Sequence, residues 1–557
     1  RIYDEANNDA LPFSNIFIDG TSIGAASDFD GNFIIAGVRP GIYQLTASSL
    51  GYETRVTEEI QVLPGRTVTI DIPMSVSAQT LDEVVVTAEV FRRNQEAPIS
   101  LRSVGISEIE NSPGANRDIS KVIQTLPGVA AFPAQNRNDI IVRGGASSES
   151  KFYLDDIEIP NINHFATQGE SGGTNGILNA DFIREVQFYS GAFPANRGNA
   201  LSGIFNFRQI DGNMEETKLR GTIGASEVSL TLDGPLADNT TFIMSVRRSY
   251  LNFLFKLIGL PFLPTFNDAQ FKVKTKIDDR SEITFIGLGS FDTNVLDRDL
   301  NNPNEFQAYL LGNIPENEQW SYAIGSVYKR FRNNGFSTMV LSRNMLNNRF
   351  YKYRDNIIDD INLLHDYSSF EAENKFRIEN FIRTDNNFRI TYGANMEYAR
   401  YYNSTFLNIF TPFGPQTIDF DSGFDMFKYG LFGQISQSFV ANTLNLTFGF
   451  RFDGNNYSES LAKAWEQFSP RFSASYLLTE KWSLNFNTGR YYQLPAYTSL
   501  GYRDSNNRLV NKENEIKYIS ADHLIAGVEF RPGSRSLISL EGFYKAYSNY
   551  PFSVKDS

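Results

Sequence analysis

The sequence predicts a mainly β protein with three parts: a small N-terminal β-sandwich, a mixed α/β domain and a transmembrane antiparallel β-barrel. Short strand-like segments separated by tight turns occupy the first 77 residues, and a Gly-rich stretch with one helix follows. From about residue 218 the chain becomes a long series of segments in which apolar and polar residues alternate. At 557 residues the chain also exceeds the size at which a single core normally keeps growing.

The composition excludes several classes of function. Phe (46) and Tyr (27) far outnumber Trp (3), which favours an outward apolar band with aromatic girdles. The net charge of −13 argues against a nucleic-acid partner, because phosphate binding needs a concentrated basic surface. Cysteine is absent, and His164, His365 and His523 lie far apart, so we expect no disulfide, no metal site and no zinc or thiol enzyme.

The most apolar segment and the start of the chain lead to two further expectations. The most apolar stretch, residues 250–266, is interrupted by Gly259, Pro261 and Pro264, so we expect no transmembrane helix. The chain opens at Arg1 without a charged and then apolar leader, and we expect that a secretory signal was removed or precedes the sequence given.

Residues 1–77 are expected to form the β-sandwich, with strands at 15–19, 32–36, 42–47 and 67–72. Turns at Asp30-Gly31, Pro40-Gly41 and Pro64-Gly65 separate these strands. Segment 28–32 (DFDGN) contains two aspartates but lacks the rest of a calcium-binding loop, so we interpret it as a turn.

Residues 78–90 form a polar link around an apolar β-branched triplet. This segment contains Asp82, Glu83, Val84, Val85, Val86, Thr87 and Ala88. It is either one more strand of the first domain or an extended strand that adds to the sheet edge of another protein.

Residues 91–212 are expected to form the α/β domain. A helix is predicted at 119–126, before Pro127-Gly128, and strands at 139–143, 152–159 and 185–190. The many glycines of this region do not follow the spacing of a phosphate loop or of a dinucleotide fingerprint. We therefore expect no nucleotide and no other cofactor.

Residues 213–557 are expected to form the barrel, because short and long connections alternate between the strands. Tight turns are predicted at 233–235, 278–279, 333–334, 385–386, 441–442, 479–480 and 532–533, and long connections near 249–268, 293–318, 354–367, 407–426, 453–465 and 494–519. This alternation is typical of outer-membrane barrels, which have short periplasmic turns and long extracellular loops. About 15 strands of an expected total of about 22 are counted, so we expect an incomplete barrel that continues beyond residue 557.

Four motifs in order resemble the plug domain of TonB-dependent receptors: 140–145 (IIVRGG), 152–157 (FYLDDI), 182–191 (FIREVQFYSG) and 195–206 (ANRGNALSGIFN). The first domain resembles the carboxypeptidase-regulatory-like domain in segments 28–33, 37–43 and 50–52, and residues 82–88 resemble the TonB box. This domain order is typical of receptors from Bacteroidetes-like bacteria. One departure is Asp155-Asp156, which stands where the plug usually has Asp-Gly.

The resemblance implies active import across the outer membrane without covalent chemistry, so the protein is not expected to be an enzyme. Extracellular loops and the outward tips of the plug would bind the substrate, and TonB, with ExbB and ExbD in the inner membrane, would pull on the box. The expected surroundings are outer-membrane lipid, with the first domain and the plug on the periplasmic side or in the lumen. A surface lipoprotein partner is compatible with this, and the substrate class stays open between a siderophore or other small molecule, a glycan and a peptide.

By analogy with the plug topology, two sets of site residues are expected. The candidate substrate-binding residues are Phe132, Gln135, Asn136, Arg137, Asn163, His164, Phe165 and Gln168, which combine amide and charged groups with an aromatic ring. Arg143 and Arg197 are candidates for ion pairs with carboxylates of the barrel lumen that lock the plug in place.

Two alternatives from other classes stay open. One is a structural or scaffold subunit of a larger outer-membrane complex, in which the plug never moves. The other is a soluble, β-rich cell-surface adhesin or enzyme, which predicts solubility without detergent and no alternation of connection lengths.

Overall fold

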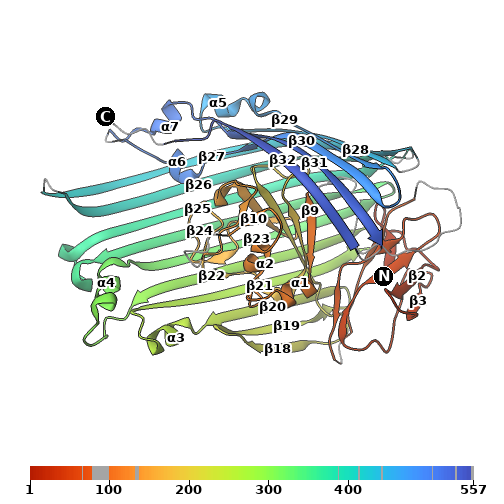
Figure 1. Ribbon diagram of the computed structural model, residues 1–557, viewed down its shortest axis with the longest axis horizontal. Helices are drawn as coiled ribbons and strands as arrows, with labels where there is room; N and C mark the ends of the chain where they lie inside the picture. The colour runs from red at the N-terminus through yellow and green to blue at the C-terminus, as the bar shows by residue number, and fades with distance from the viewer. Residues whose placement is uncertain are drawn as a thin grey trace.

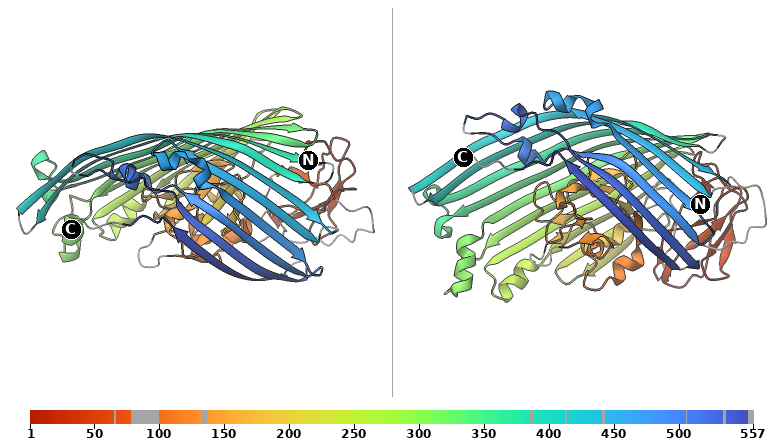
Figure 2. Two further views of the ribbon diagram at one scale, coloured as in Figure 1. Left: turned by 90° about the horizontal axis from the view of Figure 1, so that it is seen from above. Right: turned by 45° about the horizontal axis from the view of Figure 1, so that its top comes forward.

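The computed structural model describes residues 1–64, 67–77, 100–131, 137–384, 386, 388–411, 414–440, 443–504, 506–533 and 536–552, apart from the side chain of residue 410. A curved, open sheet forms a barrel wall, the α/β domain lies on its concave side, and the N-terminal domain lies at one end (Figures 1 and 2). In this described part of the chain, no helix is both long and apolar enough to cross a membrane.

The N-terminal domain consists of three small sheets. Strands β3 (Gly24–Ala26), β2 (Asn15–Ile18), β5 (Leu45–Ser48) and β6 (Arg55–Val56) form one sheet, β4 (Gly41–Tyr43) pairs with β7 (Ile60–Val62), and β1 (Ile2–Asp4) runs parallel to β8 (Ile72–Met74). The predicted strand at 32–36 is wrong: Phe33 and Ile35 pack against the core from irregular backbone. The strand predicted at 67–72 begins only at Ile72. The predicted turn is confirmed, because Oδ1 of Asp28 accepts hydrogen bonds from the backbone N–H groups of Asp30 and Asn32.

The α/β domain is built on a five-stranded sheet in the order β13-β12-β17-β16-β9. These strands are β9 (Leu101–Gly105), β12 (Ser150–Leu154), β13 (Ile157–Ile159), β16 (Ile183–Tyr189) and β17 (Gly203–Gln209), and two short pairs flank them: β10 (Val129–Ala130) with β11 (Ile141–Val142), and β14 (Asn163–His164) with β15 (Asn175–Gly176). Helices α1 (Ile106–Asn111) and α2 (Ile119–Gln124) cover the sheet, and the side chain of Asp118 caps α2. The single strand predicted at 152–159 is a hairpin, because Asp155 and Asp156 both adopt positive φ.

The barrel wall is one antiparallel sheet of fifteen strands in sequence order, which confirms the predicted strand number. The strands are β18 (Lys218–Ile223), β19 (Glu227–Ala237), β20 (Thr240–Ser249), β21 (Phe262–Asp278), β22 (Ser281–Leu296), β23 (Glu316–Arg332), β24 (Gly335–Tyr353), β25 (Leu363–Arg383), β26 (Arg389–Thr411), β27 (Gly414–Phe439), β28 (Leu444–Asn455), β29 (Ser469–Leu477), β30 (Trp482–Gln493), β31 (Ile519–Gly533) and β32 (Ser536–Ser548). Side chains alternate between the two faces: in β24, Val340 is buried whereas Met339 and Leu341 point outward and are exposed.

The long connections gather at the end of the barrel opposite the N-terminal domain (Figure 1). They carry the short helices α3 (Leu251–Leu257), α4 (Glu305–Asn313), α5 (Glu459–Ala462), α6 (Tyr497–Leu500) and α7 (Val510–Glu513). Two predicted connections are wrong. The turn expected at 233–235 lies inside β19, which pairs with β20 as far as Ala237, and most of the loop expected at 407–426 is paired backbone of β26 and β27.

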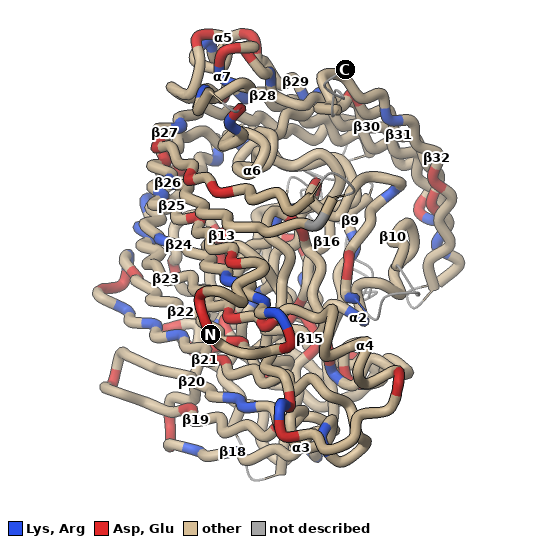
Figure 3. Tube along the Cα trace, turned by 90° about the vertical axis from the view of Figure 1, so that its left-hand side faces the viewer, with Lys and Arg blue, Asp and Glu red and all other residues tan. Residues whose placement is uncertain are grey.

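The α/β domain and the wall share one apolar core. Ile286 and Leu288 of β22, Ala323 of β23 and Val340 of β24 lie in the same buried cluster as the domain's own aliphatic and aromatic residues. Acidic and basic positions are interspersed on the domain and on the surrounding wall (Figure 3). The domain is therefore bound to the wall by apolar packing and by charged groups together.

Candidate functional site

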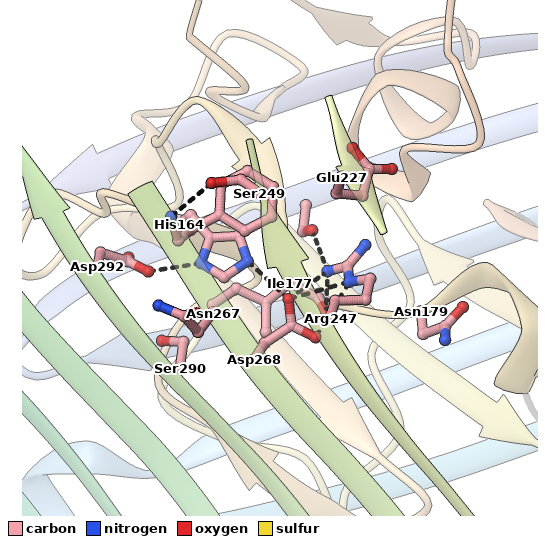
Figure 4. Close-up of polar contacts among 12 residues, drawn as sticks. His164, Ile177, Asn179, Glu227, Arg247, Ser249, Asn267, Asp268, Ser290 and Asp292 are labelled. Carbon is pink, nitrogen blue, oxygen red and sulfur yellow. Dashed lines mark hydrogen bonds and ion pairs between the residues drawn. The ribbon is translucent and has the colours of Figure 1, made fainter. Parts of the chain in front are cut away.

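The tip of the α/β domain, residues 161–177, lies against strands β20, β21 and β22. Figure 4 shows His164 between two carboxylates of this wall. Its Nδ1 is 2.7 Å from Oδ1 of Asp292 and its Nε2 is 3.0 Å from Oδ2 of Asp268. The ring also stacks on Phe266, with 4.2 Å between the ring centroids. The imidazole is completely buried, so both nitrogens depend on these two carboxylates for hydrogen bonds.

His164 is held in its charged form by its neighbours. Burial by itself lowers the pKa of the imidazole, but the charge of Asp292 and hydrogen bonds to Asp268 and Asp292 outweigh it and raise the pKa to about 9. The imidazolium then donates one hydrogen bond to each carboxylate. Because these carboxylates belong to different strands, a single side chain of the α/β domain joins β21 to β22.

Arg247 of β20 completes this cluster on the barrel side. Its Nη2 lies 2.9 Å from Oδ2 of Asp268, and it donates to the backbone carbonyls of Gly176 and Ile177 at 2.8 and 2.7 Å. Asp292 binds backbone as well, because its Oδ2 accepts the N–H of Phe165 at 2.8 Å. The cluster therefore fixes both strands of the tip, at 163–165 and at 175–177.

Two glutamines extend the contact along the tip. The side-chain amide of Gln319 on β23 accepts from the N–H of Ala166 and donates to its carbonyl, both at 2.8 Å. Gln168 donates to Glu371 at 2.8 Å and accepts from Tyr367 and Ser369 of β25 at 3.1 and 2.8 Å. The tip is thus bound to the wall from β20 to β25.

The candidate substrate-binding residues are mostly used in these contacts. Asn163 and His164 are fully buried, and Asn163 donates to the carbonyl of Ser171 at 2.7 Å. Both side chains are therefore used in contacts of the α/β domain, and their assignment to substrate binding stays a prediction. Arg137 pairs with Asp139 at 2.8 Å and donates to Thr167. Phe132, Gln135 and Asn136 lie outside the described residues.

A second charged cluster surrounds the hairpin between β12 and β13. Asp156 forms ion pairs with Arg197 and Arg208 of its own domain and lies 3.5 Å from Arg377 of β25. Burial raises the pKa of this carboxyl, but the charges of Arg208, Arg197 and Arg377 hold it well below its usual range. The ion pair of Arg197 is thus made within the domain, whereas a barrel carboxylate was expected.

Glu158 connects the same hairpin to the wall and, through it, to an outer loop. It pairs with Lys151 at 3.0 Å and with Lys375 of β25 at 2.8 Å, and Lys375 pairs with Glu373 at 2.7 Å. The hydroxyl of Tyr497, on α6, donates to Glu373 at 2.5 Å. A chain of polar contacts therefore joins the loop to the hairpin.

The third cluster lies where the α/β domain begins. Nη2 of Arg143 is 2.5 Å from Oε2 of Glu541 on β32 and donates to Oγ of Ser100 at 3.0 Å. Ser100 itself donates to Glu541 through its hydroxyl at 2.9 Å. Arg143 thus pairs with a barrel carboxylate, as a lock residue requires. The segment resembling a TonB box, residues 82–88, lies outside the described residues, between Ser77 and Ser100.

The sequence did not single out the wall residues of these clusters, namely Arg247, Asp268, Asp292, Gln319, Lys375 and Glu541. One signal was present for Asp268: in β21 the inward positions read Phe266, Asp268, Gln270 and Lys272, all of them buried. Polar residues at the inward positions of a barrel strand indicate either a wet lumen or a polar partner.

A curved β-wall that is joined by buried ion pairs to a folded lumenal domain defines the class of plugged β-barrel proteins. Three family models match the chain: TonB dependent receptor-like, beta-barrel, at residues 262–557; TonB-dependent Receptor Plug Domain, at 93–204; and CarboxypepD_reg-like domain, at 1–86. The barrel match covers more than half of the chain, which therefore belongs to the TonB-dependent receptors. These are outer-membrane receptors and transporters and not enzymes.

Among curated proteins, the chain is similar to the Ferrienterobactin receptor of Escherichia coli (strain K12), with 28% identity over 185 residues, 29% of this chain and 24% of that protein. It is also similar to the TonB-dependent transporter Oar of Myxococcus xanthus, with 22% identity over 37% of this chain and 19% of that protein. A third relative, TonB-dependent receptor P26 of Formosa agariphila, is 30% identical over 23% of this chain and 11% of its own length. The chain matches less than a quarter of the length of each of these relatives.

Two solved structures show the same fold. A mutant form of the ferric enterobactin receptor PfeA of Pseudomonas aeruginosa matches with a TM-score of 0.60 at 17% identity. The match covers 81% of this chain and 71% of the PfeA chain. The siderophore receptor PirA of Acinetobacter baumannii has a TM-score of 0.58 at 15% identity, with 81% of this chain and 70% of that chain covered.

Proposed function

We propose that the protein imports a substrate across the outer membrane and that TonB drives this import by rearranging the plug. The observation that carries the proposal is the composition of the plug–wall contact. Three clusters of ion pairs and polar hydrogen bonds, around His164, Asp156 and Arg143, hold the plug in the lumen. When the plug moves, these polar groups can bind water in place of one another, so the part of the contact that they form beside the shared apolar core can be broken and formed again.

The substrate is proposed to enter from the side of the long connections. Gln168, on the tip of the plug, and Arg137, which donates to Thr167 of the tip, are proposed as its contacts there, together with Phe132, Gln135 and Asn136. The similarity to receptors named for ferric enterobactin and for siderophores supports a small molecule of the siderophore class as the first cargo to test. The short turns and the N-terminal domain would then face the periplasm, with outer-membrane lipid around the barrel.

Energy is proposed to reach the plug through residues 82–88. TonB, with ExbB and ExbD in the inner membrane, would capture Val84, Val85 and Val86 by strand addition, because this triplet has a high β-propensity. A pull on this segment would apply force to the plug at Ser100, which is hydrogen-bonded to both Arg143 and Glu541.

Binding to the purified periplasmic domain of TonB tests this proposal. Replacement of Val84, Val85 and Val86 by Gly should abolish binding, because the segment loses its β-propensity and its apolar side chains. A matched control replaces Ile357, Ile358 and Ile361, exposed residues at the opposite end of the barrel, by Gly. Binding that is equal in both variants would remove the box assignment and favour the structural or scaffold subunit.

A further inference from the structure

The N-terminal domain is attached to the short-turn end of the barrel by buried charge. Asp4, on β1, is almost fully buried, and its Oδ2 lies 3.0 Å from Nη2 of Arg383 at the end of β25. The same carboxylate accepts from the N–H of Ala6 at 2.8 Å and from the hydroxyl of Tyr52 at 3.1 Å. Arg383 therefore binds a carboxylate that the domain has already fixed in position.

A second attachment lies several strands away on the same rim. Asp71 lies 3.9 Å from the ammonium groups of both Lys274 and Lys276 on β21. The side chain of Asn8 donates to the carbonyl of Asp279, in the turn after β21, at 2.5 Å. The domain thus bridges the rim from β21 to β25, so it lies across this end of the lumen (Figure 2).

The domain also contacts the plug directly. Glu59 accepts hydrogen bonds from the hydroxyl and the N–H of Ser107, in α1, at 2.5 and 2.7 Å. Gln61 donates to Glu110 of the same helix at 3.1 Å. A Cβ at Gly105 would lie only 2.5 Å from Oε2 of Glu59, so the two surfaces are closely fitted.

Beside the contact with α1 lies a chamber whose walls come from all three parts of the chain. Ile60 and Thr69 contribute from the N-terminal domain, Arg117 and Ala180 from the plug, and Arg220 from β18. The chamber borders the side of the plug that faces away from the long connections. The N-terminal domain is therefore one wall of a chamber that the plug and the barrel also line.

The residues on either side of segment 78–99, which contains residues 82–88, are both held by hydrogen bonds. Ser77, the last described residue of the N-terminal domain, donates its N–H to the carbonyl of Gly51. Ser100, the first described residue of the plug, is held by Glu541. A pull on residues 78–99 consequently acts on the N-terminal domain as well as on the plug.

We propose that the N-terminal domain is a gate that closes the exit side of the plug, held shut by the ion pairs of Asp4 and Asp71 with the barrel rim. The inference rests on the proposed import function, because a gate at this position matters only if a cargo leaves there. Its partner surface is the rim of the same chain, between β21 and β25.

The absence of cysteine from the sequence makes a direct test possible. A single reporter, Ala180→Cys, is placed in the chamber, and the rate of its labelling by a bulky maleimide is measured on the purified full chain in detergent. Asp238→Cys, in the exposed turn between β19 and β20, gives the rate for an uncovered site at the same end. The reporter in the chamber should react at least about tenfold more slowly, because labelling requires opening of the gate.

The ion pairs of Asp4 and Asp71 with the rim are then weakened by substitutions in the barrel, so that the N-terminal domain keeps its own sequence. Arg383→Gln combined with Lys276→Gln should speed labelling of Ala180→Cys by about tenfold, since the broken pair leaves Asp4 buried without its cation. Arg383→Lys in place of Arg383→Gln should restore slow labelling, because lysine keeps a positive charge beside Asp4. The matched control is Asp30→Asn, which neutralises an exposed carboxylate of the same domain and should leave the rate unchanged.

Labelling that is as fast at Ala180→Cys as at Asp238→Cys, or that does not respond to the double variant, would overturn the gate. An equal response to Asp30→Asn would also overturn it, because the effect would then be a general one of charge. No TonB is present in this experiment, so its failure leaves the import proposal untouched. Loss of the TonB interaction, conversely, would not alter the labelling rates.

Discussion

Nδ1 of His164 lies 2.7 Å from Oδ1 of Asp292, and this contact joins the tip of the plug to strand β22 of the wall. The two residues are 128 positions apart in the sequence, and both side chains are fully buried. A charged pair without access to water is stabilising only while both partners keep their charge. The attachment of the tip should therefore depend on pH.

The first prediction concerns this pH dependence. The pKa of His164 is raised from 6.5 to about 9, so its contribution to stability is fully present below pH 6.5 and is lost as the pH rises through about 9. The contribution is on the order of 3 kcal/mol. We expect protection of the Phe165 amide from hydrogen exchange, corrected for the intrinsic pH effect, to fall across this window. His164→Gln should abolish the fall and His365→Gln should keep it; an unchanged pH profile in His164→Gln would refute the assignment.

The second prediction concerns the clamp of Arg143 and Glu541. Glu541→Ala leaves the guanidinium of Arg143, whose side chain is only 7% exposed, without its carboxylate. We expect the plug to lose about 3 kcal/mol of stability against urea, the lower end of the range for breaking a buried pair.

The control for this clamp is an ion pair in the long connection between β30 and β31. Arg508 lies 2.7 Å from Asp504, and the side chain of Arg508 is 58% exposed. Arg508→Ala should therefore cost less than about 1 kcal/mol, because solvent screens the attraction. Losses of equal size in the two variants would show that Glu541 does not lock the plug.

The sequence predicted the parts of this structure that depend on local patterns. Alternation along each strand gave the barrel and its strand number, because the side chains of a half-buried strand have a period of two. The loop predicted at 407–426 failed because β26 and β27 pair as far as Thr411 and Gly414, and pairing between neighbours outweighs a locally irregular sequence.

The partners within the site depend on long-range geometry. His164 reads as a polar loop residue in the sequence, since nothing near it shows that Asp268 and Asp292 will enclose it. The rotation of the plug inside the wall decides which inward residue meets which plug residue, and no local pattern encodes that rotation. Arg143 was predicted as a lock residue from its motif alone, but its partner Glu541 could not be named.

The third prediction concerns the shape of the tip. A Cβ at Gly173 would lie 2.4 Å from the backbone oxygen of His164 and 2.5 Å from Cβ of Asn163. Gly173→Ala should therefore force β14 away from its position and cost about 2 kcal/mol, as overpacking of a fitted contact does. Amide protection at residues 163–166 measures the effect.

Gly312, in α4, provides the matched control. A Cβ there has nothing within 4 Å, and alanine favours helix over glycine by about 1 kcal/mol. Gly312→Ala should leave tip protection unchanged. If Gly173→Ala also left the amide protection of the tip unchanged, the tip would not be held as closely as the structure indicates.

The last prediction concerns the link between an outer loop and the plug. The hydroxyl of Tyr497 donates to Glu373 at 2.5 Å and accepts from Lys428 at 2.6 Å, and Glu373 is linked through Lys375 to Glu158 of the plug. Tyr497→Phe removes only the hydroxyl, so Glu373 and Lys428 each lose one hydrogen bond. This loss should cost about 1–3 kcal/mol of stability.

The loss should appear mainly as faster hydrogen exchange in α6, because the ring still packs in the aromatic cluster with Tyr401 and Phe424. Exchange in β13, near Glu158, should rise as well, but by less, since Lys375 keeps its own ion pair with Glu158. Tyr502→Phe, at an exposed position beyond the same helix, should change neither. A rise confined to α6 would mean that the loop is fastened to the wall alone, and a rise in both would mean that movement of the loop reaches the plug through Glu373 and Lys375.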